Sequence, residues 1–154
     1  MASTPSQDLR QAVRRLRALT YFYDAFLKLA ISGVREIVGE RGADIILKTP
    51  ARQYGMNVCK GLRALGMNLD PVKVLRQVLE QAGTMPEIRQ DGNRIIVKLH
   101  KCPFHRPWEE PLLCHITEGF LTGLVEPFTA VKTNRKATMA EGAESCIFEL
   151  NFEV

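Results

Sequence analysis

The chain has 154 residues, of which 45% are apolar and 25% are charged, and this composition is typical of a soluble globular protein. No apolar stretch reaches the roughly 18 residues of a membrane-spanning helix, because charged residues interrupt the longest candidate at residues 19–38. The N-terminus lacks the basic and then apolar pattern of a secretory signal. Four cysteines without such a signal predict a cytoplasmic protein whose thiols stay reduced.

The net charge is +4, and much of the excess comes from arginines near the N-terminus, whereas the C-terminal end is acidic. A basic segment of this kind is typical of a solvated helix face, and it could alternatively contact phosphate or an acidic partner. No helix-turn-helix, zinc-finger or aromatic-stacking motif accompanies it, so we do not expect direct nucleic-acid binding. The arginines are Arg10, Arg14, Arg15 and Arg17.

Helical periodicity dominates the first half of the chain. The first predicted helix ends before Gly39, and a short piece that follows it is expected to end or to kink at Pro50, because the residue before a proline disfavours helical backbone. Gly66 is the expected C-cap of the next helix, and Asp70 is the expected N-cap of the last one. The predicted helices cover residues 5–38, 44–49, 51–65 and 71–81.

The second half changes to the two-residue period of strands. Asp91-Gly92 predicts a two-residue hairpin turn, because both residue types accept the positive φ that such a turn needs. A loop with three prolines, a helix at residues 112–125 and a second hairpin follow; the predicted strands lie within residues 87–100, 128–139 and 145–153. We therefore predict an α+β fold, with a helical N-terminal half packed on a four-stranded antiparallel sheet made of two hairpins with an intervening helix.

Glycine and cysteine recur at characteristic places in the last third of the chain. A cysteine enters a helix that has two glycines four residues apart, and this spacing leaves a smooth face that a backbone or a ligand can approach closely. A second cysteine opens the last strand just after a glycine turn. Over residues 47–152 this order of elements resembles the 4-vinyl reductase, or hydrocarbon-binding, domain family. The resemblance depends on Cys114, Gly119, Phe120, Gly123, Gly142, Cys146 and Phe148.

The resemblance implies a fold similar to vesicle-tethering transport-particle subunits and heme-based nitric-oxide sensor domains. Such domains bury a small hydrophobic ligand between helices and a twisted sheet, usually as homodimers, and some are attached to regulators. The chain then divides into a helical extension at residues 1–46, expected to make the dimer contact, and a ligand-binding domain at residues 47–154. We therefore predict a small-molecule binding or sensory protein that is a homodimer and acts through a regulator protein.

Aromatic residues are the predicted ligand contacts, because small-molecule pockets are mostly apolar with a few polar groups for orientation. Helical spacing favours an ordinary core for Phe22, Phe26 and also Phe120, and close helix packing for the two glycines. Trp108 in the proline loop is better placed for the rim of a pocket. The predicted ligand-binding residues are Tyr54, Phe104, Trp108, Phe120 and Phe128.

The resemblance also implies a structural zinc site, whose first and last cysteines match Cys114 and Cys146. Arg135 and Thr138 stand where the family has an acidic residue and a further cysteine, so Cys102 could replace a missing ligand. One of the three histidines could complete the site: His100, His105 or His115. We expect zinc or an iron–sulfur cluster at Cys102, Cys114 and Cys146, with buried, packed thiols as the alternative.

A second function stays open at this point. Neighbouring basic residues could lower the pKa of the Cys102 thiol, and the resemblance includes a hydrolase-like branch with a similar Cys-Pro element. The alternative to a binding protein is therefore a thiol-dependent hydrolase-like enzyme centred on Cys102, with His105 as its partner.

Overall fold

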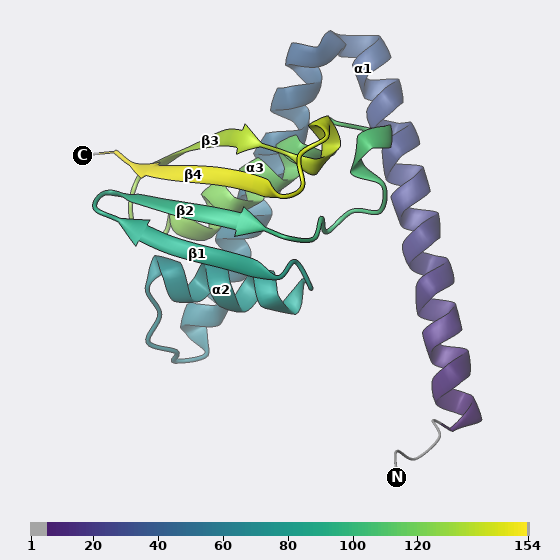
Figure 1. Cartoon of the computed structure of the whole chain (residues 1–154), viewed down its shortest axis with the longest axis horizontal. Coiled ribbons are helices and arrows are strands. Elements are labelled where there is room, and N and C mark those ends of the chain that lie inside the picture. The colour runs from purple at the N-terminus through teal and green to yellow at the C-terminus, as the bar shows by residue number, and fades with distance from the viewer. Residues whose placement is uncertain (1–5, 154) are drawn as a thin grey trace.

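The computed structural model describes residues 6–153 and confirms the α+β class. The four strands form one antiparallel sheet in the order β1-β2-β4-β3, and helices cover one of its faces (Figure 1). The helices are α1 (Gln7–Ala64), α2 (Pro71–Gln81) and α3 (Leu113–Val125), and the strands are β1 (Pro86–Asp91), β2 (Arg94–Leu99), β3 (Val131–Ala137) and β4 (Cys146–Phe152); two short 3-10 helices are η1 (Pro107–Glu109) and η2 (Met139–Glu141).

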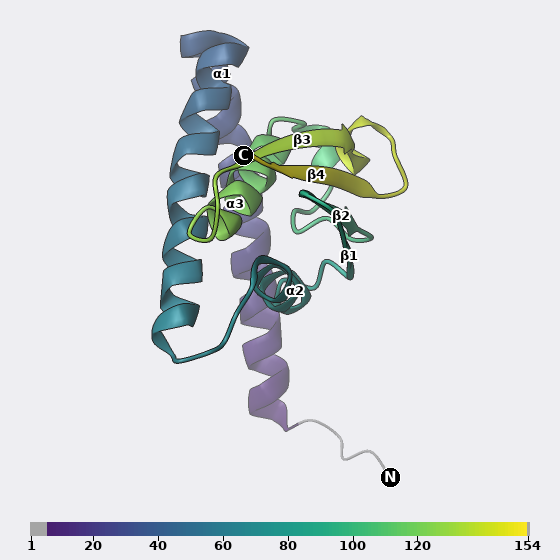
Figure 2. The ribbon, with the colours of Figure 1, turned by 90° about the vertical axis from the view of Figure 1, so that its left-hand side faces the viewer.

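Helix α1 folds back on itself at Gly39, whose φ of 73° and ψ of 175° are not helical. Its two arms, residues 7–38 and 40–64, therefore run in opposite directions (Figures 1 and 2). The positive φ suits glycine, because this residue has no Cβ to clash with the backbone. The predicted end of the first helix at Gly39 is confirmed.

Of the two outcomes predicted at Pro50, the end of a helix is wrong, because α1 continues through Pro50 to Ala64. A proline inside a helix loses one hydrogen bond and disfavours the preceding turn. Here the turns on both sides of Pro50 lie against α3, and backbone atoms of Lys48 and Arg52 approach its glycines closely. Tertiary packing therefore outweighs the local preference of the proline.

The predicted hairpins and caps are confirmed with small shifts of their boundaries. Asp91 pairs with Arg94, so the turn residues are Gly92 and Asn93 instead of the predicted Asp91 and Gly92, and of these residues only Gly92 has a positive φ, of 61°. The Lys73 N–H donates to Oδ1 of Asp70 at 2.9 Å, which makes Asp70 the N-cap of α2. The strand predicted from residue 128 begins only at Val131, after the chain has turned out of α3.

The main core lies between the sheet and the helices α2 and α3. Its centre contains Val97 and Phe148 from the sheet, Leu75 from α2, and Leu121 and Leu124 from α3. A smaller second core joins the two arms of α1 to the start of α3. In contrast to the prediction of an ordinary core, Phe22 and Phe26 are each 62% exposed, because this part of α1 contacts the rest of the molecule through its other side, at Asp24 and Lys28.

Within residues 6–153, we find no helix that combines the length and the apolar character needed to cross a membrane.

Candidate functional site

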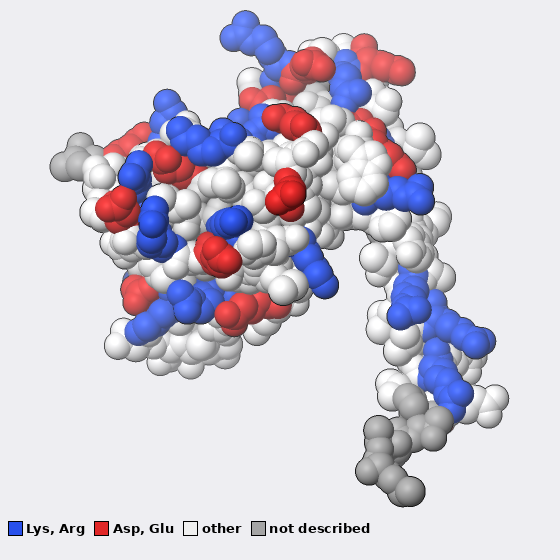
Figure 3. All heavy atoms as spheres, viewed as in Figure 1, with Lys and Arg blue, Asp and Glu red and all other residues white. Residues whose placement is uncertain are grey.

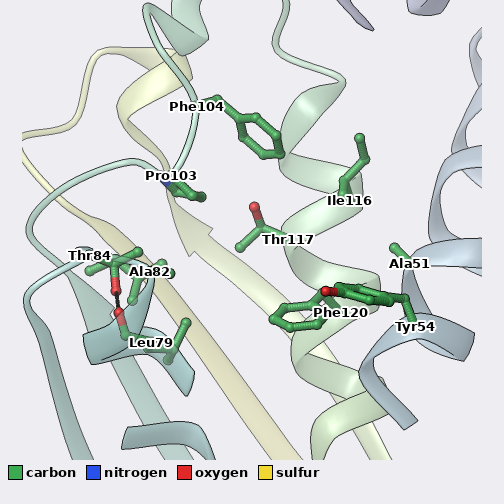
Figure 4. Close-up of a pocket in the computed structure, with 11 residues that line it drawn as sticks. Ala51, Tyr54, Leu79, Ala82, Thr84, Pro103, Phe104, Ile116, Thr117 and Phe120 are labelled. Atoms are coloured by element: carbon green, nitrogen blue, oxygen red, sulfur yellow. Dashed lines mark hydrogen bonds between the residues drawn. The ribbon is translucent and has the colours of Figure 1, made fainter. Parts of the chain in front are cut away.

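An apolar cavity of about 200 Å³ lies where the second arm of α1, the end of α2, the middle of α3 and the loop after β2 meet (Figure 4). Each of these elements directs at least one side chain into the cavity. The lining residues are Ala51, Tyr54, Leu79, Ala82, Thr84, Leu99, Pro103, Phe104, Ile116, Thr117 and Phe120. A cavity with so few polar groups suits an apolar ligand.

Three of the five predicted ligand residues line this cavity. The rings of Tyr54 and Phe120 stack at 5.4 Å between α1 and α3, and Phe104 reaches in from the proline loop. The other two lie elsewhere: Trp108 is 62% exposed in η1, and the ring of Phe128 lies 4.9 Å beneath the Arg63 guanidinium. Of the five predicted ligand residues, the structure therefore brings together Tyr54, Phe104 and Phe120.

Besides Tyr54, two threonines supply hydroxyl groups to the cavity lining, and the sequence prediction missed both. The Thr84 hydroxyl is already engaged, since it donates to the Leu79 carbonyl at 2.8 Å. The Thr117 hydroxyl has no hydrogen-bond partner among the residues that the structure describes, so it is available to a ligand. Thr117 lies three residues before Phe120 on α3, and this helical spacing was the signal that could have identified it.

The glycines of α3 serve helix packing. A Cβ at Gly119 would lie 2.6 Å from the Lys48 carbonyl oxygen, and one at Gly123 would lie 2.0 Å from that of Arg52. From the opposite side, a Cβ at Gly55 would lie 2.4 Å from the Phe120 carbonyl oxygen. The two helices therefore cross in backbone contact, and this contact fixes the wall of the cavity that contains Tyr54 and Phe120.

Three thiols gather next to the cavity. Cys102 lies in the loop just before Pro103, Cys114 lies in the first turn of α3, and Cys146 begins β4. The pKa of the Cys102 thiol is raised to about 11, mainly by burial and in small part by the two other cysteines. The Phe104 N–H, which donates to its Sγ at 3.4 Å, lowers this pKa but does not outweigh burial. Burial also raises the pKa of Cys114 and of Cys146, so all three thiols are protonated at neutral pH.

The residues at the two remaining positions of the expected zinc site lie beside Cys114. Both Arg135 and Thr138 lower the pKa of the Cys114 thiol, although burial outweighs them. A guanidinium and a hydroxyl are not the ligands that zinc takes in structural sites. Across residues 6–153, no group of three or more histidine, cysteine or acidic side chains is arranged to hold a metal ion. Zinc or an iron–sulfur cluster at Cys102, Cys114 and Cys146 stays a prediction.

The histidines have partners other than these thiols. His100 contacts Glu87 at 2.8 Å, and His115 contacts Asp44 at 2.6 Å. The His105 ring packs edge-on against Tyr21 at 5.2 Å, and its backbone N–H donates to Asp24. Because a thiolate is the nucleophile of cysteine enzymes, a protonated Cys102 gives no support to catalysis, and an enzyme built on Cys102 and His105 stays a prediction.

Two solved structures share this fold over most of the chain. One is trafficking protein particle complex subunit 3 from Naegleria fowleri covalently bound to palmitic acid, with a TM-score of 0.55, 11% identity, and 87% of this chain and 97% of that chain covered. The other is an H-NOX protein from Shewanella oneidensis in the Fe(II)NO ligation state, with a TM-score of 0.51, 16% identity, and coverages of 83% and 74%. At these identities the likeness shows the fold, and it confirms the expected similarity to these two classes.

Sequence comparison gives a family but no characterised relative. No curated protein matches the chain. A family model described as methanogen output domain 1 matches residues 69–151, so the family differs in name from the expected 4-vinyl reductase family. Because the match covers more than half of the residues, the chain belongs to the family of methanogen output domain 1.

Proposed function

We propose that this chain is a small-molecule sensory domain whose cavity between α1, α2 and α3 takes a small hydrophobic ligand. The observation that carries the proposal is the cavity itself, which is lined by three aromatic rings and by the Thr117 hydroxyl, which has no hydrogen-bond partner among the described residues. The family description as an output domain agrees with a role in signalling. The structural relatives add support, since one is covalently bound to palmitic acid and the other is in an Fe(II)NO ligation state.

The size of the cavity limits the ligand. An apolar cavity of about 150 Å³ takes one benzene molecule, so about 200 Å³ suits a single aromatic ring with small substituents or a short alkyl chain. A hydroxyl or carbonyl group on the ligand would pair with Thr117. The hydrocarbon binding suggested by the 4-vinyl reductase resemblance fits this size class.

The position of the cavity links binding to the helix crossing. Tyr54 and Phe120 lie on the two helices that touch at Gly55, Gly119 and Gly123. A ligand that prefers one spacing of these helices would shift their equilibrium, because it can stabilise only the arrangement that it binds better. We propose that this shift is passed to a partner protein, namely the regulator protein expected from the sequence.

The test is a titration of the purified chain with toluene, phenol and indole, followed by the NMR shifts of methyl groups around the cavity. We expect binding, and we expect Thr117→Phe to abolish it because the new ring fills the cavity. Phe104→Ala should enlarge the cavity and favour indole over phenol. The matched control is Trp108→Ala, which removes an aromatic residue of the same loop outside the cavity lining and should leave binding unchanged. Binding that survives in Thr117→Phe, or no binding of any probe, would contradict the proposal.

A further inference from the structure

The outer part of α1 extends past the body of the molecule (Figures 1 and 2). Farther along the same arm, one side of the helix faces the body: Asp24 accepts from the His105 N–H at 3.2 Å, Lys28 contacts Glu109 at 3.2 Å, and Ile31 is buried. Arg35 pairs with Glu110 on the same side. From Tyr23 to Ile37 the opposite side of this arm faces away from the body, whereas Leu16, nearer the N-terminus, borders a hollow that Pro103 and His105 also line.

Large apolar side chains follow one another along that opposite side. They occur with the alternating spacings of three and four residues that define a coiled-coil seam. Small residues, Ala12, Ala30 and Gly33, occupy the remaining positions of the same repeat, and a Cβ at Gly33 would meet nothing within 4 Å. The large residues, between 42% and 84% exposed, are Leu9, Leu16, Leu19, Tyr23, Phe26 and Ile37; we name this set, with the small residues, the α1 stripe.

The charged residues of the arm avoid the α1 stripe. Arg10, Arg14 and Arg17 occupy positions of the repeat that turn away from the seam. Asp8, Arg15 and, about six turns beyond Arg15, Glu36 occupy the position that flanks it, and neither Arg15 nor Glu36 has an ion-pair partner within residues 6–153. Figure 3 shows the basic side chains along the arm. The seam is therefore apolar, and the charges that border it are Asp8, Arg15 and Glu36.

We propose that the α1 stripe is an interface with a second copy of this chain, in which the two first arms of α1 pair antiparallel. In this register Tyr23 of one copy packs beside Phe26 of the partner subunit, and Arg15 lies next to Glu36 of the partner subunit. Parallel pairing would instead bring the arginine clusters of both copies together at one end, where like charges repel. The antiparallel arrangement places the arginine clusters of the two copies at opposite ends of the interface. The N-terminal part of each first arm then covers the part of the other copy's α1 stripe that lies beside the body of that copy.

The first test measures the mass of the purified chain in solution by sedimentation over a dilution series. We expect a dimer, and we expect Leu19→Glu/Phe26→Glu to be monomeric, because two carboxylates would be buried in the seam of each copy. The matched control is Ala18→Glu/Ala25→Glu, which adds the same charges to exposed positions of the same arm outside the seam and should remain dimeric. Circular dichroism should show equal helix content in all variants. A monomeric parent chain, or a dimer that tolerates the seam carboxylates, would overturn the proposal.

The second test addresses the antiparallel register through the flanking charges. Arg15→Glu and Glu36→Arg should each raise the dimer dissociation constant about threefold to tenfold, and the double variant should restore it, because the pair is then reformed with its charges exchanged. A parallel dimer would not couple the two positions, so independent effects in the double variant would overturn the register. Binding of the monomeric chain to anionic vesicles through the stripe would identify a membrane as the occupant and overturn the proposal as a whole.

Discussion

The backbone contact between α1 and α3 predicts a steep penalty for the smallest side chain at Gly123. In Gly123→Ala the new Cβ would lie 2.0 Å from the Arg52 carbonyl oxygen, whereas Cβ contacts below 3.0 Å are essentially never observed, so the helices must separate by about 1 Å, the difference of the two distances. Overpacking of this kind costs about 1–3 kcal/mol or more. Alanine regains about 1 kcal/mol of helix propensity, so for so close a contact we expect a net loss of about 1–2 kcal/mol.

Two further glycines make the experiment quantitative. Gly119→Ala needs a shift of only about 0.4 Å, since its Cβ would lie 2.6 Å from the Lys48 oxygen, and should cost less. Gly61→Ala is the control: this glycine is exposed on α1, with nothing within 4 Å of an added Cβ, and the substitution should stabilise the protein by about 0.5–1 kcal/mol. The measurement is the free energy of unfolding from urea titrations. If Gly123→Ala proved as stable as Gly61→Ala, the inferred helix contact would be refuted.

The same substitution connects stability with binding. Tyr54 and Phe120 stack across this helix crossing and form one wall of the cavity. Helices that separate by about 1 Å would therefore displace both rings. Gly123→Ala should accordingly weaken binding of small aromatic probes as well as folding, whereas a loss of stability caused elsewhere in the chain would leave the cavity wall intact.

Local signals in the sequence were sufficient for most elements of the fold. Asp70 and Pro71 begin a helix by capping, Gly92 makes a hairpin turn with Asn93, and Gly39 ends the first arm, and each effect involves only neighbouring residues. Pro50 was misinterpreted because its effect is decided by a helix more than sixty residues away in the chain. No local pattern reports that α3 supports the turns on both sides of Pro50.

The candidate site could be predicted in part, for a related reason. Aromatic residues in a ligand-binding fold are reasonable candidates, and Tyr54, Phe104 and Phe120 do line the cavity. Residue type alone does not separate them from Phe128, whose ring faces Arg63 instead. Thr84 contributes to the cavity only because the loop after α2 returns to the end of β2, and such a long-range contact is not encoded in spacing.

For Phe22 and Phe26 the sequence predicts the helix correctly but not the burial of the side chains. Helical periodicity correctly placed them on a helix, but periodicity does not reveal whether a partner covers the apolar face. The body of the molecule ends before this face is covered, so the pattern that suggested a core belongs instead to an exposed surface. In the proposed dimer the periodicity would regain its usual meaning, with the partner subunit supplying the missing side of the core.

Two further predictions concern buried charge and buried thiols. Arg35→Ala would leave the Glu110 carboxylate, which is 5% exposed, with the Leu112 N–H at 3.2 Å as its remaining partner, and should cost about 2 kcal/mol in urea titrations; Arg35→Met/Glu110→Gln should recover most of this loss. The pKa of Cys102 near 11 in the folded state lies above its ordinary value of 9.0, so the folded chain holds this proton more tightly than the unfolded chain. The resulting stability is fully present below about pH 9 and is lost as the pH rises through about 11. Cys102→Ser should therefore flatten the decline of the unfolding free energy over this range, measured under reducing conditions. A decline equally steep in Cys102→Ser and in the parent chain would mean that burial does not favour the protonated thiol.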